Sequence, residues 1–151
     1  MISRQLKNLA LVTFILVIFS APAVFAVPTG PIIGKVTLVL GQLSGQDQDG
    51  DRVVVERCTD LYAGYTLDTA ARAFLGAELN DGTKMTVSQN GSATLDEFSF
   101  NDVGGGQFNA TVAQGGFSYE SGRLGTSRVH SSISTLSGVI GGSRGYVDPD
   151  A

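Results

Sequence analysis

Three aspartates at alternate positions are the residues with the clearest potential for chemistry. Asp47, Asp49 and Asp51 stand in the segment QDQDGD beside a glycine, and this pattern resembles the start of a calcium-binding loop. A complete loop of that kind also needs a bidentate glutamate further along, and Glu56 comes too early. We therefore predict a polar surface loop here and no bound metal or other cofactor. A calcium-stabilised module is the weaker alternative.

The single histidine is the only side chain whose ordinary pKa lies near neutrality. His130 stands among serines in the segment RVHSSIS, so a Ser–His pair is conceivable. A nucleophilic triad would also need an orienting acid and an oxyanion hole, and the chain contains no G-x-S-x-G elbow. We predict that His130 is a surface or turn residue. We expect no catalytic residues and no enzymatic activity.

The chain has one cysteine, Cys58, and therefore no internal disulfide. It follows a strand-like segment, VVVERC. Most unpaired cysteines behave as small core residues, and we predict the same for Cys58. The alternative is a thiol that pairs between chains or responds to redox conditions.

Short strands joined by tight turns are predicted to position these residues. In residues 79–100, the turn signals Asn80-Asp81-Gly82 and Asn90-Gly91 supply the positive φ that two-residue hairpin turns need. Apolar side chains at every second position flank the turns, as in strands with one buried face. We predict two consecutive hairpins with these inward residues: Met85, Val87, Ala93, Leu95, Phe98 and Phe100.

Strand-sized runs recur along the rest of the chain at a spacing of about 8–12 residues, which is typical of all-β folds. No segment after residue 27 shows a helical period, and there is no exact internal repeat. We predict an all-β fold, either sandwich-like or solenoid-like, with Phe108 and Phe117 as further core anchors. The four tyrosines are assigned to core or interface. The expected strands are 32–40 (with Val36, Leu38 and Leu40 on one face), 52–57, 65–67, 69–79, 107–113 and 117–119. Residues 41–51 are expected to be a glycine-rich loop and 60–64 a turn, and 129–140 is a serine- and threonine-rich segment with interspersed apolar residues.

The N-terminal segment predicts export. Arg4 and Lys7 precede a nearly uninterrupted apolar run, Leu9–Phe19, and the segment SAPAVFA then offers a cleavage site before Val27. We expect a signal peptide over residues 1–26 and a periplasmic or secreted protein with no membrane span after cleavage. An uncleaved membrane anchor is the alternative.

The mature domain, residues 27–151, is acidic and long enough for one domain with its own core. It retains eight Lys and Arg residues against 14 Asp and Glu residues, a net charge of −6, because two of the ten basic residues lie in the leader. Such a surface repels a phosphate backbone. We therefore expect no nucleic-acid partner.

The order of several motifs resembles the FecR domain, a module of the bacterial cell envelope. The resemblance covers roughly residues 32–146 and departs from the family at its end, where Tyr146 stands in place of the usual threonine. Each motif is weak alone, and their order and spacing carry the likeness. The motifs are Gly34-Lys35-Val36, LYAGYTLDTAARA, LNDGTKMTV followed by QNGSATLDEF, QGGFSYESGRLG, and ISTLSGVIGGSRG.

This resemblance implies a β-rich module that works through its surface. The best-known members sense iron-siderophore uptake through a cytoplasmic anti-sigma segment, a membrane helix and an extra C-terminal domain. We do not expect that role in transmembrane sigma regulation to carry over to this chain. We expect a non-enzymatic module that binds a partner protein in the cell envelope, in a sensing, regulatory or scaffold role. The alternative is a structural, self-assembling extracellular protein, in which residues 131–145 could supply an added strand.

Overall fold

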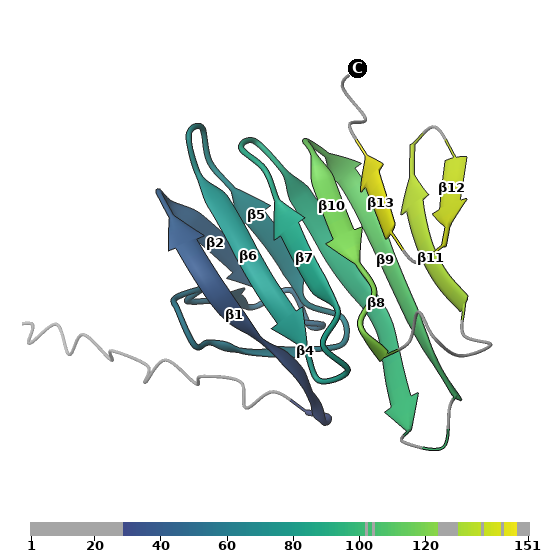
Figure 1. Ribbon diagram of the computed structural model, residues 1–151. Coiled ribbons are helices and arrows are strands. Elements are labelled where there is room, and N and C mark those ends of the chain that lie inside the picture. Colours follow the sequence, from purple (N-terminus) through teal and green to yellow (C-terminus); the bar gives the residue numbers. More distant parts are fainter. Residues whose placement is uncertain are drawn as a thin grey trace, which may run out of the picture.

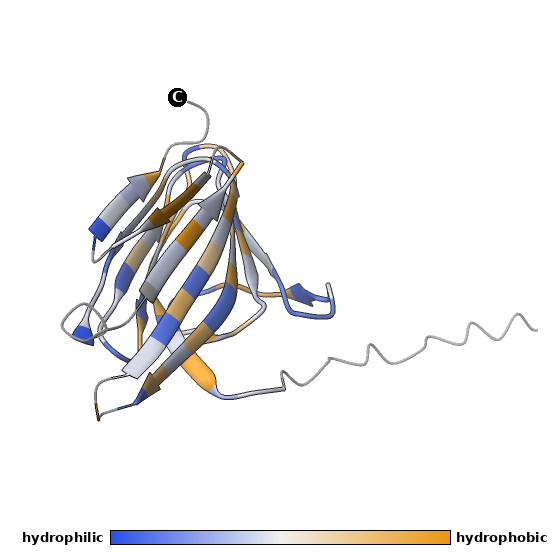
Figure 2. Cartoon of the chain, turned by 90° about the vertical axis from the view of Figure 1, so that its right-hand side faces the viewer, coloured by the Kyte–Doolittle hydropathy of each residue, from blue (hydrophilic) through white to orange (hydrophobic). Residues whose placement is uncertain are grey.

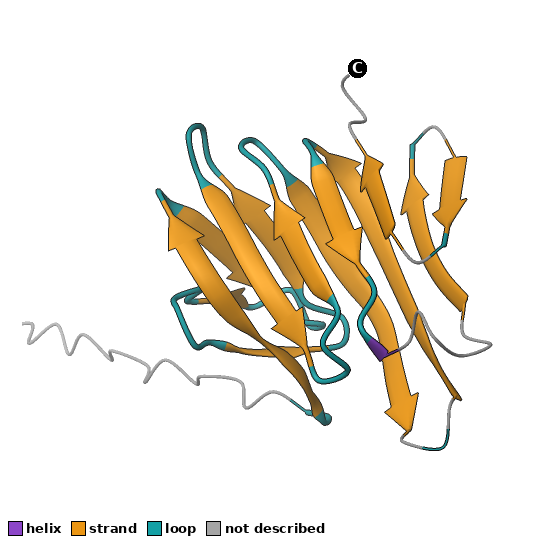
Figure 3. Ribbon diagram, viewed as in Figure 1, coloured by secondary structure: helices purple, strands orange, loops and turns teal. Residues whose placement is uncertain are grey.

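The computed structural model describes residues 29–101, 103, 105–123, 130–136, 138–142 and 144–147, which form two packed β-sheets (Figure 1). These residues contain no α-helix; the short purple segment in Figure 3 is a 3₁₀ conformation at Arg123. None of the described residues forms a helix long and apolar enough to cross a membrane. The all-β prediction is confirmed, and of the two predicted architectures the chain adopts the sandwich. The predicted signal peptide, 1–26, lies outside the described residues.

Each of the two sheets contains strands from both the N-terminal and the C-terminal part of the domain. Neighbouring strands run antiparallel throughout, except that β11 lies parallel to β9. Sheet A has the order β13 (Arg144–Val147), β10 (Phe117–Glu120), β7 (Lys84–Val87), β6 (Phe74–Leu79), β1 (Ile32–Leu40), β4 (Asp60–Tyr62). Sheet B has the order β12 (Gly138–Gly141), β11 (His130–Thr135), β9 (Gly105–Gln114), β8 (Ser92–Asn101), β5 (Thr66–Thr69), β2 (Leu43–Gln46), β3 (Arg52–Val53).

The core lies between the sheets and is built from every second residue of the strands, as the alternating colours in Figure 2 show. Met85, Val87, Ala93 and Leu95 are all buried, as their spacing predicted. Burying an aliphatic side chain of this size contributes roughly 1.5–3 kcal/mol. Burial of these inward apolar side chains therefore holds the strands in their positions.

The predicted aromatic anchors divide into two pairs. Phe108 and Phe117 are fully buried, whereas Phe98 and Phe100 are only half-buried and pack against the edge of the core. The prediction was wrong for that second pair because the distal part of the β8–β9 hairpin extends past sheet A (Figure 1). The aromatic ring of Phe98 still meets the edge of Phe108, with centroids 6.4 Å apart.

Only one of the two predicted hairpins forms. The turn at Asn80-Asp81-Gly82 joins β6 and β7 as an antiparallel pair. The turn at Asn90-Gly91 instead carries the chain from β7 in sheet A to β8 in sheet B. Asn90 has the expected positive φ of 53°, so the signal fixed the local backbone. The choice of pairing partner came from the buried contacts.

A β-bulge reverses the predicted alternation in β1. Its register with β6 shifts between Val36 and Leu38. Val36 is therefore buried, while Leu38 and Leu40 are 46% and 52% exposed and the following inward residue, Val39, packs against the core. A single extra residue moves all later side chains to the opposite face, so the prediction of one common face was wrong.

Several predicted boundaries also shift. The glycine-rich loop expected at 41–51 contains β2, and the turn expected at 60–64 contains β4, because short polar strands are held by backbone pairing that no apolar pattern reports. The strand expected at 52–57 keeps only Arg52–Val53, and the strand expected at 69–79 begins at Phe74 after a turn in which Arg72 has a φ of 62°. The described part of the serine- and threonine-rich segment 129–140 contributes β11 and most of β12.

Candidate interaction surface

The three aspartates lie in and beside the turn between β2 and β3. Asp47 is 7% exposed, and its Oδ1 accepts hydrogen bonds from the backbone N–H groups of Asp49 at 3.0 Å and Asp51 at 2.9 Å. The Asp47 carboxylate therefore serves to close the turn. Asp49 and Asp51 are exposed. In the part of the chain that the structure describes, no three His, Cys, Asp or Glu side chains converge as metal ligands.

Cys58 is exposed, so the prediction of a buried core thiol was wrong. It occupies a turn before β4 with a φ of 71°, and its backbone N–H donates to the carbonyl of Val36 at 2.8 Å. The turn places Val55 inward instead, at 7% exposure. His130 begins β11 opposite Gln107 of β9; the predictions for its side chain lie outside the described residues.

A buried polar lock holds the hairpin between β6 and β7. The Thr83 hydroxyl donates to Asp81 Oδ2 at 2.7 Å and accepts the backbone N–H of Gly122 at 3.1 Å. The Thr83 backbone N–H donates to Asp81 Oδ1 at 3.0 Å. Both side chains are at most 1% exposed. The Asp-Gly-Thr motif thus ties its own turn to Gly122, 39 residues after Thr83. The sequence did not predict this role, although an aspartate can hydrogen-bond to the backbone two residues further on in an Asx turn.

A second buried threonine anchors the crossover between the sheets. Thr69 Oγ1 accepts the backbone N–H of Gly91 at 2.8 Å and donates to the carbonyl of Ser88. A Cβ atom on Gly91 would lie 2.6 Å from the Ser88 carbonyl oxygen, which explains the glycine of the Asn-Gly signal. Thr69 and Thr83 therefore use their hydroxyls to hold the backbone.

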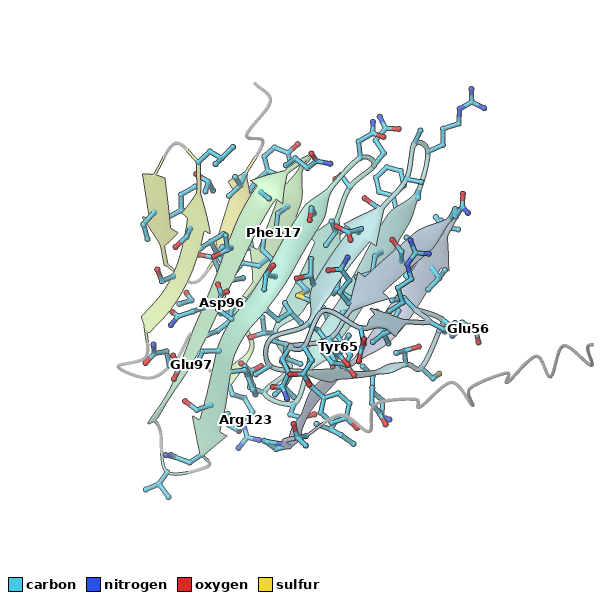
Figure 4. The ribbon with its side chains drawn as sticks, turned by 180° about the vertical axis from the view of Figure 1, so that it is seen from behind. Glu56, Tyr65, Asp96, Glu97, Phe117 and Arg123 are labelled. Atoms are coloured by element: carbon cyan, nitrogen blue, oxygen red, sulfur yellow. The ribbon has the colours of Figure 1, made fainter. Side chains whose placement is uncertain are left out.

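The outer face of sheet B carries two acids that hydrogen-bond to their neighbours. Glu97 accepts from the side-chain amides of Gln107 and Asn109 at 3.1 and 3.2 Å, and Asp96 accepts from the Thr111 hydroxyl at 2.7 Å. Figure 4 shows both acids on the long strands of this sheet, with Arg123 near its lower end. These exposed contacts follow the strand register and bring no nucleophile or base into a cleft.

The concave regions among the described residues include a groove and a pocket. A groove of about 240 Å³ crosses β7, β10 and β13 on the outer face of sheet A, and a pocket of about 290 Å³ opens at one end of the sandwich. The groove is polar and includes the ion pair between Glu120 and Arg144. The pocket is lined by Pro31, Ile32, Ile33, Asn80, Phe98, Ser99 and Phe100.

The phenol of Tyr65 is a buried titratable group whose proton affinity is perturbed by the fold. Burial raises the pKa of Tyr65 above its usual value, and the nearby Tyr62 and Asp47 raise it further. The ring is 2% exposed and lies 5.3 Å from that of Tyr62. A phenol whose pKa is raised stays protonated at neutral pH, so it is not poised to act as a base.

An apolar patch lies on the outer face of sheet A, at the β1 end. It consists of Leu38, Leu40 and Phe74, which are 46%, 52% and 39% exposed. Leu40 and Phe74 are direct cross-strand partners, and Leu38 packs over Gly76, where a Cβ atom would lie 3.0 Å from the Leu38 Cβ. The β1 bulge creates this patch, because it turns both leucines outward.

The patch adjoins a free strand edge. In the described residues, β4 pairs with β1 only over Ile32–Lys35, and the Leu38–Leu40 end of β1 pairs with β6 alone. Such an edge presents unpaired backbone groups to another chain. The structure thus brings three apolar side chains and a free edge together, whereas Asp47, Asp49 and Asp51 form no metal-binding group among the described residues.

Comparisons with protein-family models, with curated proteins and with solved structures find no match for this chain.

Proposed function

We propose that this chain is an exported, non-enzymatic module similar to the FecR domain, which binds a partner protein in the bacterial cell envelope. The apolar patch beside the free edge of β1 is the observation that supports this function most directly. The export signal over residues 1–26 and the motif order over 32–146 give the proposal its location and its family resemblance.

The proposed mode of binding is strand addition. An extended segment of the partner pairs with the backbone of Leu38–Leu40 and places an apolar side chain against Leu38, Leu40 and Phe74. Covering the exposed halves of these three side chains contributes roughly 3 kcal/mol. That corresponds to about a hundredfold in Kd, enough for the patch to decide whether a backbone-mediated contact persists.

The test compares two variants of the mature protein in pull-downs from envelope extract. The patch variant carries Leu40→Ser and Phe74→Ser. The control variant carries Val103→Ser and Leu136→Ser, which are 98% and 85% exposed at other sites. We expect the wild type and the control variant to capture the same protein and the patch variant to lose it, with circular dichroism unchanged in all three.

Two outcomes contradict the proposal. One is capture of the same protein in equal yield by the patch variant, which would place binding elsewhere. The other is recovery of the chain itself and nothing else.

A further inference from the structure

A row of alternating charges crosses the whole outer face of sheet A. Each member is the direct cross-strand partner of the next, so the row follows from the strand register alone. All but half-buried Asp60 are exposed. In strand order from β4 to β13, the row reads Asp60, Lys35, Glu78, Lys84, Glu120, Arg144.

The charges at the two ends of the row differ from those inside it. Each interior charge has an opposite charge on both sides; Lys84, for example, lies between Glu78 and Glu120. Asp60 pairs with Lys35, and Arg144 pairs with Glu120, but the strands that carry these two end residues are the edges of sheet A. The row therefore ends in an acid at one edge and a base at the other.

The strand directions at these edges are also complementary. Strand direction alternates at every step across sheet A, so β13 and β4 run in opposite directions. If β13 of one molecule lay beside β4 of another, the two would form an antiparallel pair. Arg144 could then face the second molecule's Asp60 and the alternation of charge would continue without a break.

Sheet B also has two edge strands, β12 and β3, and Figure 1 shows β12 on the same side of the sandwich as β13. Its strands β12 and β3 also run in opposite directions. Exposed apolar side chains occur at both ends: Val139 is 68% and Ile140 37% exposed on β12, and Val54, directly after β3, is 75% exposed. The two sheets can therefore both continue across one contact.

We propose that copies of this chain associate head to tail, with β13 of one molecule beside β4 of the next and Arg144 opposite Asp60. Such a contact joins two different surfaces, so it extends into an open chain or closes into a ring. The proposal goes beyond partner binding, because it uses the strand edges and the charge row and none of the three patch residues. Self-assembly is the alternative function predicted from the sequence, and this proposal specifies which strands would pair in it.

The register makes a covalent test available. If Arg144 faces Asp60 in an antiparallel pair, Tyr146, two residues further along β13, lies toward the turn before β4 that carries Cys58 of the neighbouring molecule. Tyr146 is 64% exposed, and Cys58 is exposed. The test mixes the wild type with a Tyr146→Cys, Cys58→Ser double variant and adds a short bis-maleimide.

We expect a cross-linked dimer in the mixture and only monomer when either protein is treated alone. High salt should lower the yield, because it screens exposed charges. Replacing Arg144 by Gln in the double variant should slow cross-linking about threefold, the effect of one exposed ion pair. Absence of the dimer at millimolar protein overturns the proposal, and so does dimer formation by either protein alone. Circular dichroism of each variant excludes misfolding as the cause.

Discussion

Replacement of Thr83 by valine tests whether the Asp-Gly-Thr motif is a structural lock. Valine keeps the shape of threonine and removes the hydroxyl, which lies in a fully buried position. The change deletes the donor to Asp81 Oδ2 and leaves the backbone N–H of Gly122 without that acceptor. The perturbation is therefore confined to two hydrogen bonds.

The expected loss of stability follows from these two contacts. A hydrogen bond to a charged group contributes about 1.5–3 kcal/mol, and a buried donor left unsatisfied costs about 1–3 kcal/mol. Allowing for partial relaxation, we expect Thr83→Val to lower the free energy of unfolding by about 3 kcal/mol. For a domain of this size, that is a fall of about 10 °C in Tm.

Urea denaturation followed by circular dichroism measures the effect. Thr86→Val is the matched control, since Thr86 lies half-buried on the outer face of β7 beside Gly76 and Ser118; we expect a change within about 0.5 kcal/mol for this surface substitution. A Thr83→Val protein as stable as the control would refute the lock.

Three further outcomes are expected. Because the folded state raises the pKa of Tyr65 above 10, it holds that proton more tightly than the unfolded state; the associated stability is complete below about pH 10 and is lost as the pH rises through the folded pKa. Tyr65→Phe should therefore flatten the alkaline decline in urea midpoint, and an unchanged slope would contradict this. Gly122→Ala should lower the free energy of unfolding by about 1–3 kcal/mol, since the alanine Cβ would lie 2.4 Å from the Asp81 carbonyl oxygen. A urea midpoint equal to that of the wild type would show that the segment around Gly122 can shift to accept the methyl group. The Cys58 thiol, being exposed, should react fully with a thiol reagent without denaturant, and protection until unfolding would argue against the observed turn.

Local sequence signals predicted the features that depend on neighbouring residues. The alternation at Met85, Val87, Ala93 and Leu95 identified buried strand faces correctly, because successive side chains of a strand point to opposite sides. The Asn90-Gly91 signal likewise predicted a positive φ. The same signal did not tell that the chain would change sheets there, since pairing depends on partners that lie far away in the sequence.

The candidate interaction surface could be predicted only in part from the sequence. Composition and turn signals predicted an all-β protein, and the resemblance to the FecR domain predicted that such a protein works through its surface. The apolar patch could not be foreseen, because alternation placed Leu38 and Leu40 with Val36 on a single face. A bulge has no side-chain signature of its own here; it is set by how β1 aligns with β6.

The amino-acid pattern alone indicates short strands with one apolar face and predicts an export signal over residues 1–26. Which strands are neighbours depends on the fold as a whole. The observed strand pairing places Leu38 and Leu40 on the outer face and buries Asp81 and Thr83. It also aligns six charges from residues 35 to 144 in one alternating row. Side-chain alternation is a property of a single strand and can be read from the sequence. The register between strands is determined by the packing of the whole core.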